Sequence, residues 1–153
     1  MSYDIQRTTL HTQPILFCPA QVPMAEMADV LGQLLPKVFG HATASGATMV
    51  GPPFVRYQNM AAVLDIQAGL PVAPGAAGTD DIELGELPAG PAVTTIHTGP
   101  YDGLPSAYSA LQAWMEDNDA TPAGGPWEVY LTDPGEVPNP EEWKTQVYWP
   151  ITE

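Results

Sequence analysis

The sequence predicts an α+β fold of two similar halves related by pseudo-twofold symmetry. We expect an antiparallel sheet with two helices on one face and a ligand cleft on the other. Three observations support this: two segments have helical apolar spacing, the intervening segments resemble paired strands, and a short motif occurs once in each half. The 153-residue length suits a single domain, 1–153, with halves at about 1–70 and 82–153.

The first half is expected to contain a strand, a helix and a hairpin. Residues 15–22 form the strand, and Pro23 suits the start of a helix that ends near Gly40. Residues 49–58 and 61–69 form the hairpin, with a turn at residues 58–60. The Pro-, Gly- and Ala-rich residues 71–81 predict an exposed linker between the halves. The helix is recognised by its spaced apolar residues, Met24, Met27, Leu31, Leu34, Leu35 and Val38.

The second half repeats this order of elements. Residues 82–87 and 91–98 predict two strands, and residues 101–117 predict a helix in which Gly99 and Pro100 mark the start. Two more strands, 127–132 and 145–151, are separated by a Pro-rich loop at 133–140. The apolar positions of the second helix are Leu104, Tyr108, Leu111, Trp114 and Met115.

The motif that suggests a duplication opens the hairpin of each half. Residues 51–57 and 124–130 both read Gly, any residue, Pro, an aromatic residue, two further residues and Tyr. The copies are 130 − 57 = 73 residues apart, and each follows a helix. Coincidence of turn residues in a Gly- and Pro-rich chain is the alternative. Two such units paired edge to edge would leave a cleft at the symmetry axis for a ligand.

The charge balance argues against nucleic-acid binding. The chain has 18 acidic and 4 basic residues, a formal net charge of -14. Affinity for phosphate backbones comes largely from Lys and Arg, so we expect no nucleic-acid partner. The same field gathers cations, although acidity that only maintains solubility is the simpler reading.

The sequence also argues against disulfide-bonded, membrane-spanning, metal-binding and cofactor-binding proteins. Cys18 is the only cysteine, so no internal disulfide can form, and we expect it to pack in the first strand of a cytoplasmic protein. Residues 1–10 have no basic region followed by an apolar stretch, so we expect no signal peptide, and the sequence has no apolar run long enough for a membrane span. His11, His41 and His97 have no metal-ligand spacing, and no cofactor motif is present. We therefore expect no membrane, no metal and no cofactor.

Alternation along the strand at residues 127–131 predicts the ligand site. If Trp127 and its apolar neighbours face the helices, Glu128 and Tyr130 point into the cleft. Tyr57 would then lie opposite, with Val55 where the other half has its carboxylate. A carboxylate among aromatic rings suits a cation with an apolar body. The alternative is that Glu128 is a solvated residue on an open sheet face.

Further aromatic residues are candidates for the walls of this site. Tyr148 and Trp149 fall on opposite faces of the last strand, so only one of them can line the cleft, and we expect Tyr148. Tyr101 follows the strand that ends at residue 98 and can reach the rim, while Trp143 lies in a loop that can cover the mouth.

Two segments resemble the GyrI-like (gyrase-inhibitor-like) family of small-molecule-binding domains, the AraC-type effector-binding domains. They are residues 95–104, Thr-Ile-His-Thr-Gly-Pro-Tyr-Asp-Gly-Leu, and residues 126–134, Pro-Trp-Glu-Val-Tyr-Leu-Thr-Asp-Pro. The resemblance covers nearly the whole chain and implies the twofold-repeated fold and a groove that binds small molecules, often lipophilic cations. It implies that Glu128 is the pocket glutamate and Tyr130 part of the aromatic wall. Family regulators carry a helix-turn-helix, which we do not expect here because the repeat begins near Met1.

Three functional hypotheses remain open. The first is a stand-alone domain that binds small organic ligands, with lipophilic cations favoured, Glu128 as counter-ion and Tyr57, Tyr130 and Tyr148 as stacking walls. The second is a hydrolase for reactive electrophiles in which Glu128 directs water, a reaction that the resemblance also implies; catalysis is the less favoured reading. The third is an acidic protein that inhibits a nucleic-acid enzyme, with the protein partner unidentified.

Overall fold

The computed structural model describes residues 3–59, 62–79, 81–132 and 136–152, and its elements fall into two compact units. Unit 1 takes the first ten residues and residues 90–153, and unit 2 takes residues 11–89. Each unit has antiparallel strands and one long helix, which agrees with the predicted α+β class.

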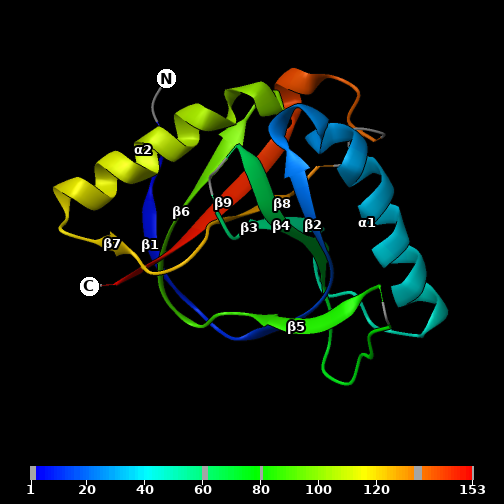
Figure 1. Ribbon diagram of the computed structural model, residues 1–153. Helices are drawn as coiled ribbons and strands as arrows, with labels where there is room; N and C mark the ends of the chain where they lie inside the picture. The colour runs from blue at the N-terminus through cyan, green and yellow to red at the C-terminus, as the bar shows by residue number, and fades with distance from the viewer. Residues whose placement is uncertain (1–2, 60–61, 80, 133–135, 153) are drawn as a thin grey trace. The chain divides into compact units, whose positions relative to one another are not determined.

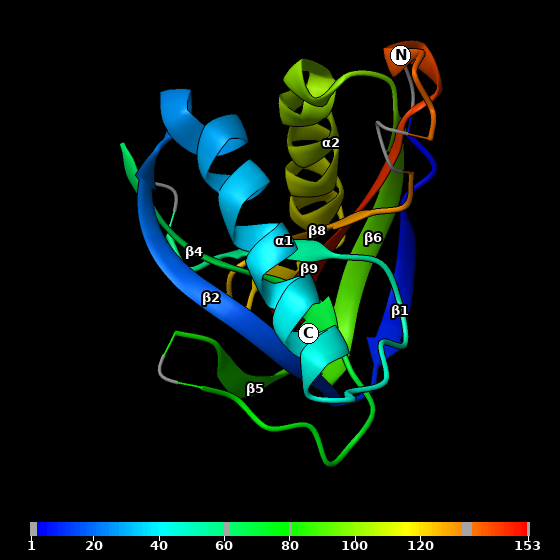
Figure 2. The same ribbon diagram turned by 90° about the vertical axis from the view of Figure 1, so that its right-hand side faces the viewer.

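Unit 2 is built on β2 (Gln13–Pro23), which pairs with β4 (Val63–Pro71) on one side and β5 (Glu83–Leu87) on the other. The short strand β3 (Phe54–Tyr57) pairs with the free side of β4. Helix α1 (Met27–Ala44), preceded by a 3-10 turn at Met24–Glu26, packs against β2 and β4, as Figure 2 shows.

Unit 1 repeats this pairing with different strands. Strand β6 (Gly90–Thr98) pairs with β1 (Gln6–Leu10) and β9 (Lys144–Thr152), and β9 also pairs with β8 (Trp127–Tyr130). The two-residue strand β7 (Thr121–Pro122) pairs with the end of β9. Helix α2 (Leu104–Asp117) follows a 3-10 turn at Tyr101–Gly103 and lies against β6 and β9 (Figure 1). A last 3-10 turn, Pro140–Glu142, precedes β9.

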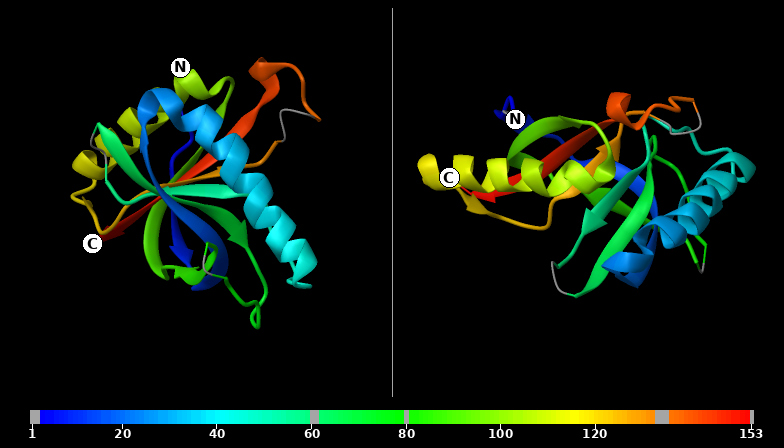
Figure 3. Two further views of the ribbon diagram at one scale, coloured as in Figure 1. Left: turned by 45° about the vertical axis from the view of Figure 1, so that its right-hand side comes forward. Right: turned by 90° about the horizontal axis from the view of Figure 1, so that it is seen from above.

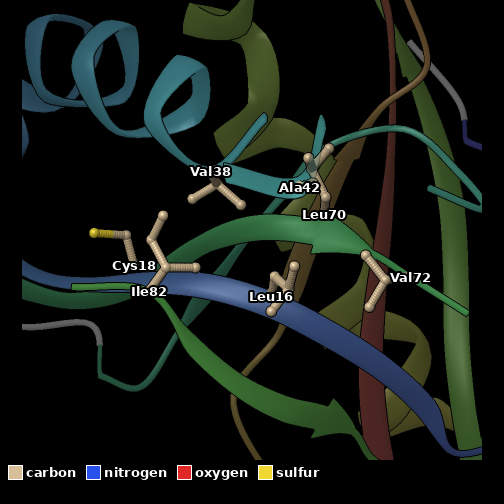
Figure 4. Packing of buried hydrophobic residues seen from close by; sticks show 7 residues of the cluster. All are labelled: Leu16, Cys18, Val38, Ala42, Leu70, Val72 and Ile82. Atoms are coloured by element: carbon tan, nitrogen blue, oxygen red, sulfur yellow. The ribbon is translucent and has the colours of Figure 1, made fainter. Parts of the chain in front are cut away.

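Each unit has an apolar core between its helix and its strands. In unit 2, Val38 and Ala42 of α1 meet side chains of β2 and β4, seen in Figure 4. In unit 1, Leu111 and Met115 of α2 meet side chains of β6 and β9, and both views in Figure 3 show this helix alongside these strands. The other buried members are Leu16, Cys18, Leu70, Val72 and Ile82 in unit 2, and Val93, Leu104, Val147, Trp149 and Ile151 in unit 1.

The first helix differs from its prediction at both ends. Pro23 ends strand β2, and the α-helix begins at Met27, four residues after the predicted start, and continues through Gly40 to Ala44. Because Val38 and Ala42 are both fully buried, packing against the strands stabilises the last turn despite the glycine. Met60 of the predicted hairpin turn lies outside the described residues.

Two strands, β1 and β5, pair differently from the predicted grouping into halves, and β1 was not predicted at all. Strand β1 has a weak apolar pattern, and it belongs with β6 rather than with the first half. Strand β5 was predicted, but it pairs with β2 of unit 2 and not with the second half. The predicted linker is partly structural, since Pro71 belongs to β4 and Val72 is buried. The shared order of elements is compatible with a duplication, which itself stays a prediction.

Candidate functional site

Glu128 lies under helix α2 and not on the opposite side of the strands. Its partner in the β8–β9 register is Val147, a member of the core beneath α2. Residues paired across an antiparallel ladder share a face, so Glu128 shares the helix face of unit 1. The predicted orientation is therefore wrong: Glu128 and Tyr130, and not Trp127, face the helix. Strand alternation was correct, but it could not say which face the helix covers.

The carboxylate of Glu128 is buried and held by two tyrosines. Only 4% of the residue is exposed. The Tyr108 hydroxyl of α2 donates to Oε2 at 2.6 Å, and the Tyr130 hydroxyl donates to Oε1 at 3.0 Å. Hydrogen bonds to a charged acceptor are shorter and stronger than neutral ones, and they offset part of the cost of burying the acid. Glu128 is therefore not a solvated surface residue.

Aromatic rings continue outward from this acid. Tyr101 meets Tyr130 edge to face, with centroids 5.6 Å apart, and lies 4.9 Å from the ring of Trp143. The indole N–H of Trp143 donates to the carbonyl oxygen of Val137 at 2.6 Å. Tyr101 is 36% exposed, so the rings extend from the buried carboxylate to solvent. We call the five rings around Glu128 the aromatic cluster: Tyr101, Tyr108, Tyr130, Trp143 and Trp149.

His97, at the end of β6, holds the turn that carries Tyr101. Its Nε2 lies 2.9 Å from the Pro100 carbonyl oxygen and its Nδ1 lies 2.9 Å from the Tyr3 hydroxyl. Because a carbonyl can only accept, Nε2 carries the proton, and in the neutral ring Nδ1 accepts from Tyr3. A side chain on Gly103 would meet this ring, since a Cβ there would lie 2.8 Å from Cε1. His97 thus has a structural role that its sequence position did not reveal.

Tyr148 lies on the other face of the same strands. It pairs with Trp127 in the register, and the two rings stack with centroids 5.7 Å apart and planes 25° apart. Burial raises the pKa of the Tyr148 phenol above its ordinary value. Tyr148 and Glu128 therefore lie on opposite faces of these strands, and a role of Tyr148 in ligand binding stays a prediction. Trp149, the alternative on the same strand, shares the face of Glu128.

Val55 and Tyr57 belong to unit 2. Val55 is fully buried and pairs with Ala68, and Tyr57 pairs with Ile66, so both lie on the face that packs against α1. The position of Val55 and Tyr57 opposite Glu128 stays a prediction, because Glu128 belongs to unit 1.

The sequence analysis did not assign two members of the aromatic cluster to the site, Trp149 and Tyr108, and Tyr108 is the one that binds Glu128 directly. It occupies an apolar position of the predicted helix, one turn after Leu104 and one before Leu111. Its signal was available: a tyrosine on the buried face of a helix needs a partner for its hydroxyl. The sequence could not identify that partner, because Glu128 is 20 residues away on another element.

Two further searches concern metals and membranes. Among the residues that the structure describes, no group of three or more His, Cys, Asp or Glu side chains could hold a metal ion. None of the helices in the described part of the chain combines the length and apolarity needed to cross a bilayer.

Comparisons with known proteins agree with the family resemblance. The model of the family described as GyrI-like small molecule binding domain matches residues 3–152. A search of curated proteins finds none that matches. Several solved structures match across nearly the whole chain. These likenesses, all below 25% identity, concern the fold.

The crystal structure of the EcmrR C-terminal domain matches with a TM-score of 0.87 and 24% identity, covering 100% of this chain and 99% of that chain. In the EcmrR–DNA complex, also 24% identical with a TM-score of 0.84, the match covers 99% of this chain and 58% of that one. SAV2435 bound to tetraphenylphosphonium has a TM-score of 0.65 and 8% identity, with 99% and 94% covered. A hydrolase from Listeria innocua has a TM-score of 0.65 and 14% identity, with 97% and 91% covered.

Proposed function

The chain belongs to the GyrI-like small molecule binding domain family, and on that premise we propose that it binds apolar organic cations at Glu128. One observation carries the proposal: a carboxylate that is 4% exposed accepts hydrogen bonds from two tyrosine hydroxyls inside the aromatic cluster. The acid supplies the counter-charge, and the rings supply the apolar walls.

The two parts of the site select for the same ligand. Each ring face is negative and attracts a cation by about 0.5 to 2 kcal/mol, more when the cation is desolvated. The carboxylate adds attraction in a place where water screens it poorly. A small hydrated ion would lose its water for little contact, whereas an organic cation replaces water with ring contacts. The net charge of -14 also raises the local concentration of cations.

The comparison with SAV2435 supports this ligand class. That structure holds tetraphenylphosphonium, a cation whose charge is enclosed by four phenyl rings. It also supplies a probe, because tetraphenylborate has almost the same size and shape and the opposite charge.

The experiment is a calorimetric titration of the protein with tetraphenylphosphonium and tetraphenylborate. We expect wild type to bind the cation and not the anion, and Glu128→Gln to lose at least about tenfold in affinity, or 1.4 kcal/mol. Glu116→Gln is the matched control, since Glu116 is exposed on α2 and the substitution removes the same charge. Equal losses in the two variants would mean that only the overall field matters and would contradict the counter-ion role.

A second candidate, hydrolysis of a strained electrophile, draws on the same two hydroxyls. The Listeria innocua neighbour is a hydrolase, and a carboxylate oriented by tyrosines can act as a general base. Glu128 would take a proton from a water molecule while the oxygen of that water bonds to an electrophilic carbon of the strained ring. The ring bond at that carbon breaks, and the other atom of the broken bond takes a proton from solvent. Mass spectrometry of an incubated cyclopropane electrophile tests this: a product mass increased by one water that forms equally with Glu128→Gln would exclude the mechanism.

A further inference from the structure

Trp149 is part of the aromatic cluster and carries a polar atom for which the described residues offer no partner. The residue is 7% exposed, and its indole Nε1 is buried without a hydrogen-bond acceptor among the described residues. The Oγ1 atom of Thr145, on the same face of β9 and opposite Tyr130 in the register, is also buried without a partner there. Two hydrogen-bonding groups therefore lie on the strand next to Glu128.

A buried N–H without an acceptor costs about 1 to 3 kcal/mol, and most buried polar groups are paired. The apolar packing of Trp149 does not require this atom, because a phenylalanine ring could also pack against Val93 and Leu111 in the core of unit 1. The N–H is therefore explained more readily by something it binds than by the stability of the core.

The position of Trp149 connects this N–H to the proposed ligand site. Its ring meets the Tyr108 ring edge to face, with centroids 5.8 Å apart and planes at 74°. Tyr108 in turn donates to Glu128 at 2.6 Å. Trp149 is two residues after Val147, the register partner of Glu128, and so lies on the same face of the strands. One tyrosine ring thus contacts both the indole and the acid.

We propose that the ligand of this site carries a hydrogen-bond acceptor, a carbonyl, ether or ring-nitrogen atom, and that the N–H of Trp149 binds it. The inference rests on the proposed function and narrows it: the ligand class becomes apolar organic cations that also bear an acceptor. An indole N–H can only donate a hydrogen bond. It could therefore bind a ligand hydroxyl through the hydroxyl oxygen, but it could not bind an ammonium group, which has no acceptor. Tetraphenylphosphonium is then an incomplete ligand, because it leaves the donor unpaired.

Pairs of probes with one shape and different polarity test the proposal. The first pairs are derivatives of tetraphenylphosphonium in which one ring carries either an acetyl group, which has the acceptor, or an isopropyl group, which has none. The two members of a pair carry the group at the same ring position, and the pairs differ in whether that position is ortho, meta or para. The second pair is neutral: benzophenone and 1,1-diphenylethylene, in which a carbonyl oxygen is replaced by a methylene group. We expect the acceptor member of at least one pair to bind wild type about five- to tenfold more tightly, the effect of one neutral hydrogen bond.

The tryptophan variants assign that preference to one atom. Trp149→Phe keeps an aromatic ring and removes the N–H, so the ratio of the affinities for the acceptor probe and its matched partner should fall to about one, whatever the change in the two affinities themselves. Trp114→Phe is the control, since this half-buried tryptophan on α2 faces Arg7. The control should keep the preference.

An NMR measurement on wild type avoids the risk that Trp149→Phe folds poorly. The indole N–H signal of Trp149, assigned by its absence in the variant or by selective labelling, should move downfield with the acceptor probe and not with its partner. No preference in any pair, or a preference that survives Trp149→Phe without a shift of this signal, overturns the proposal. Tetraphenylphosphonium binding that depends on Glu128 would still stand in that case, so the two proposals can fail separately.

Discussion

Units 1 and 2 have the same order and pairing of elements, but the corresponding strand position beneath the helix carries a different side chain in each unit. In unit 2 the order β2, α1, β3, β4 places Val55 opposite Ala68; in unit 1 the order β6, α2, β8, β9 places Glu128 opposite Val147. Val55 is fully buried and pairs with Ala68, whereas Glu128 is buried with a tyrosine hydroxyl on each oxygen.

The difference shows what a buried acid needs that an apolar side chain at the same position does not. Strand pairing and the helix are common to both units and are compatible with either side chain. A buried carboxylate in addition needs donors, and unit 1 supplies Tyr108 from its helix and Tyr130 from its strand. The buried acid therefore depends on two tyrosines that the strand pairing and the helix common to both units do not require.

Placing an acid in unit 2 should give the largest effect. Val55→Glu buries a carboxylate without the pair of tyrosine donors, and we expect a loss of more than about 3 kcal/mol in the free energy of unfolding at neutral pH. Urea unfolding measures it. Val63→Glu is the control: Val63 is 50% exposed on β4, so the change should stay within about 0.5 kcal/mol. Similar stability of the two variants would show that unit 2 can already accommodate the acid.

Removing one donor in unit 1 should have a smaller effect. Tyr108→Phe deletes a hydrogen bond to the buried carboxylate, and we expect a loss of about 1.5 to 3 kcal/mol in the free energy of unfolding. Tyr148→Phe removes a hydroxyl that makes no hydrogen bond to the described residues and should cost far less. If both variants lose the same amount, the Tyr108 hydroxyl does not stabilise Glu128.

Two glycine-to-alanine substitutions, one just before α2 and one inside α1, should change the stability of the protein in opposite directions. Gly103→Ala would place a Cβ 2.8 Å from the His97 ring and move it from Pro100 and Tyr3, at a cost of about 1 to 3 kcal/mol. Gly32→Ala in α1 meets nothing within 4 Å and should gain up to about 1 kcal/mol. Thermal unfolding compares them. Tetraphenylphosphonium affinity should fall only with Gly103→Ala, because His97 holds the turn of Tyr101.

Raising the pH should cause the smallest of these losses of stability, and it should act through a different residue in each unit. Burial raises the pKa of the Cys18 thiol in unit 2 above 9.0 and of the Tyr148 phenol in unit 1 above 10.0. Each folded form holds its proton more tightly than the unfolded chain does. Stability is therefore full below the ordinary pKa and falls above it, by at most about 1.4 kcal/mol per pH unit for each group. Urea unfolding between pH 8 and 11 should show an earlier fall in wild type than in Cys18→Ala; identical slopes would contradict the assignment.

Much of the fold could be predicted because it depends on local pattern. Apolar spacing located both helices, and alternation with turn residues located most strands. Strand β1 was missed because its side chains are largely exposed and its pairing with β6 joins residues at least 80 positions apart, as in Leu10 with Gly90. The end of α1 was misjudged because Gly40 is a weak helix former, and the burial of Ala42 that stabilises the last turn is a tertiary effect.

The sequence analysis named several residues that lie in contact around Glu128, but it did not predict how they are arranged. Glu128, Tyr130, Tyr101 and Trp143 lie together as contacts in unit 1, but the face was reversed and Tyr108 was absent. Alternation separates two sets of side chains without saying which set meets the helix, because both sets here contain aromatic residues.

By itself, the sequence determined the α+β class, most of the strands, both helices and the family, since these depend on local spacing and on short motifs. Only the tertiary structure decided that Glu128 lies under α2, that Tyr108 binds it and that the Trp149 N–H lies in the same cluster. These contacts join β8, β9 and α2 across as many as 41 positions, 149 − 108, and form only when the helix packs on the strands.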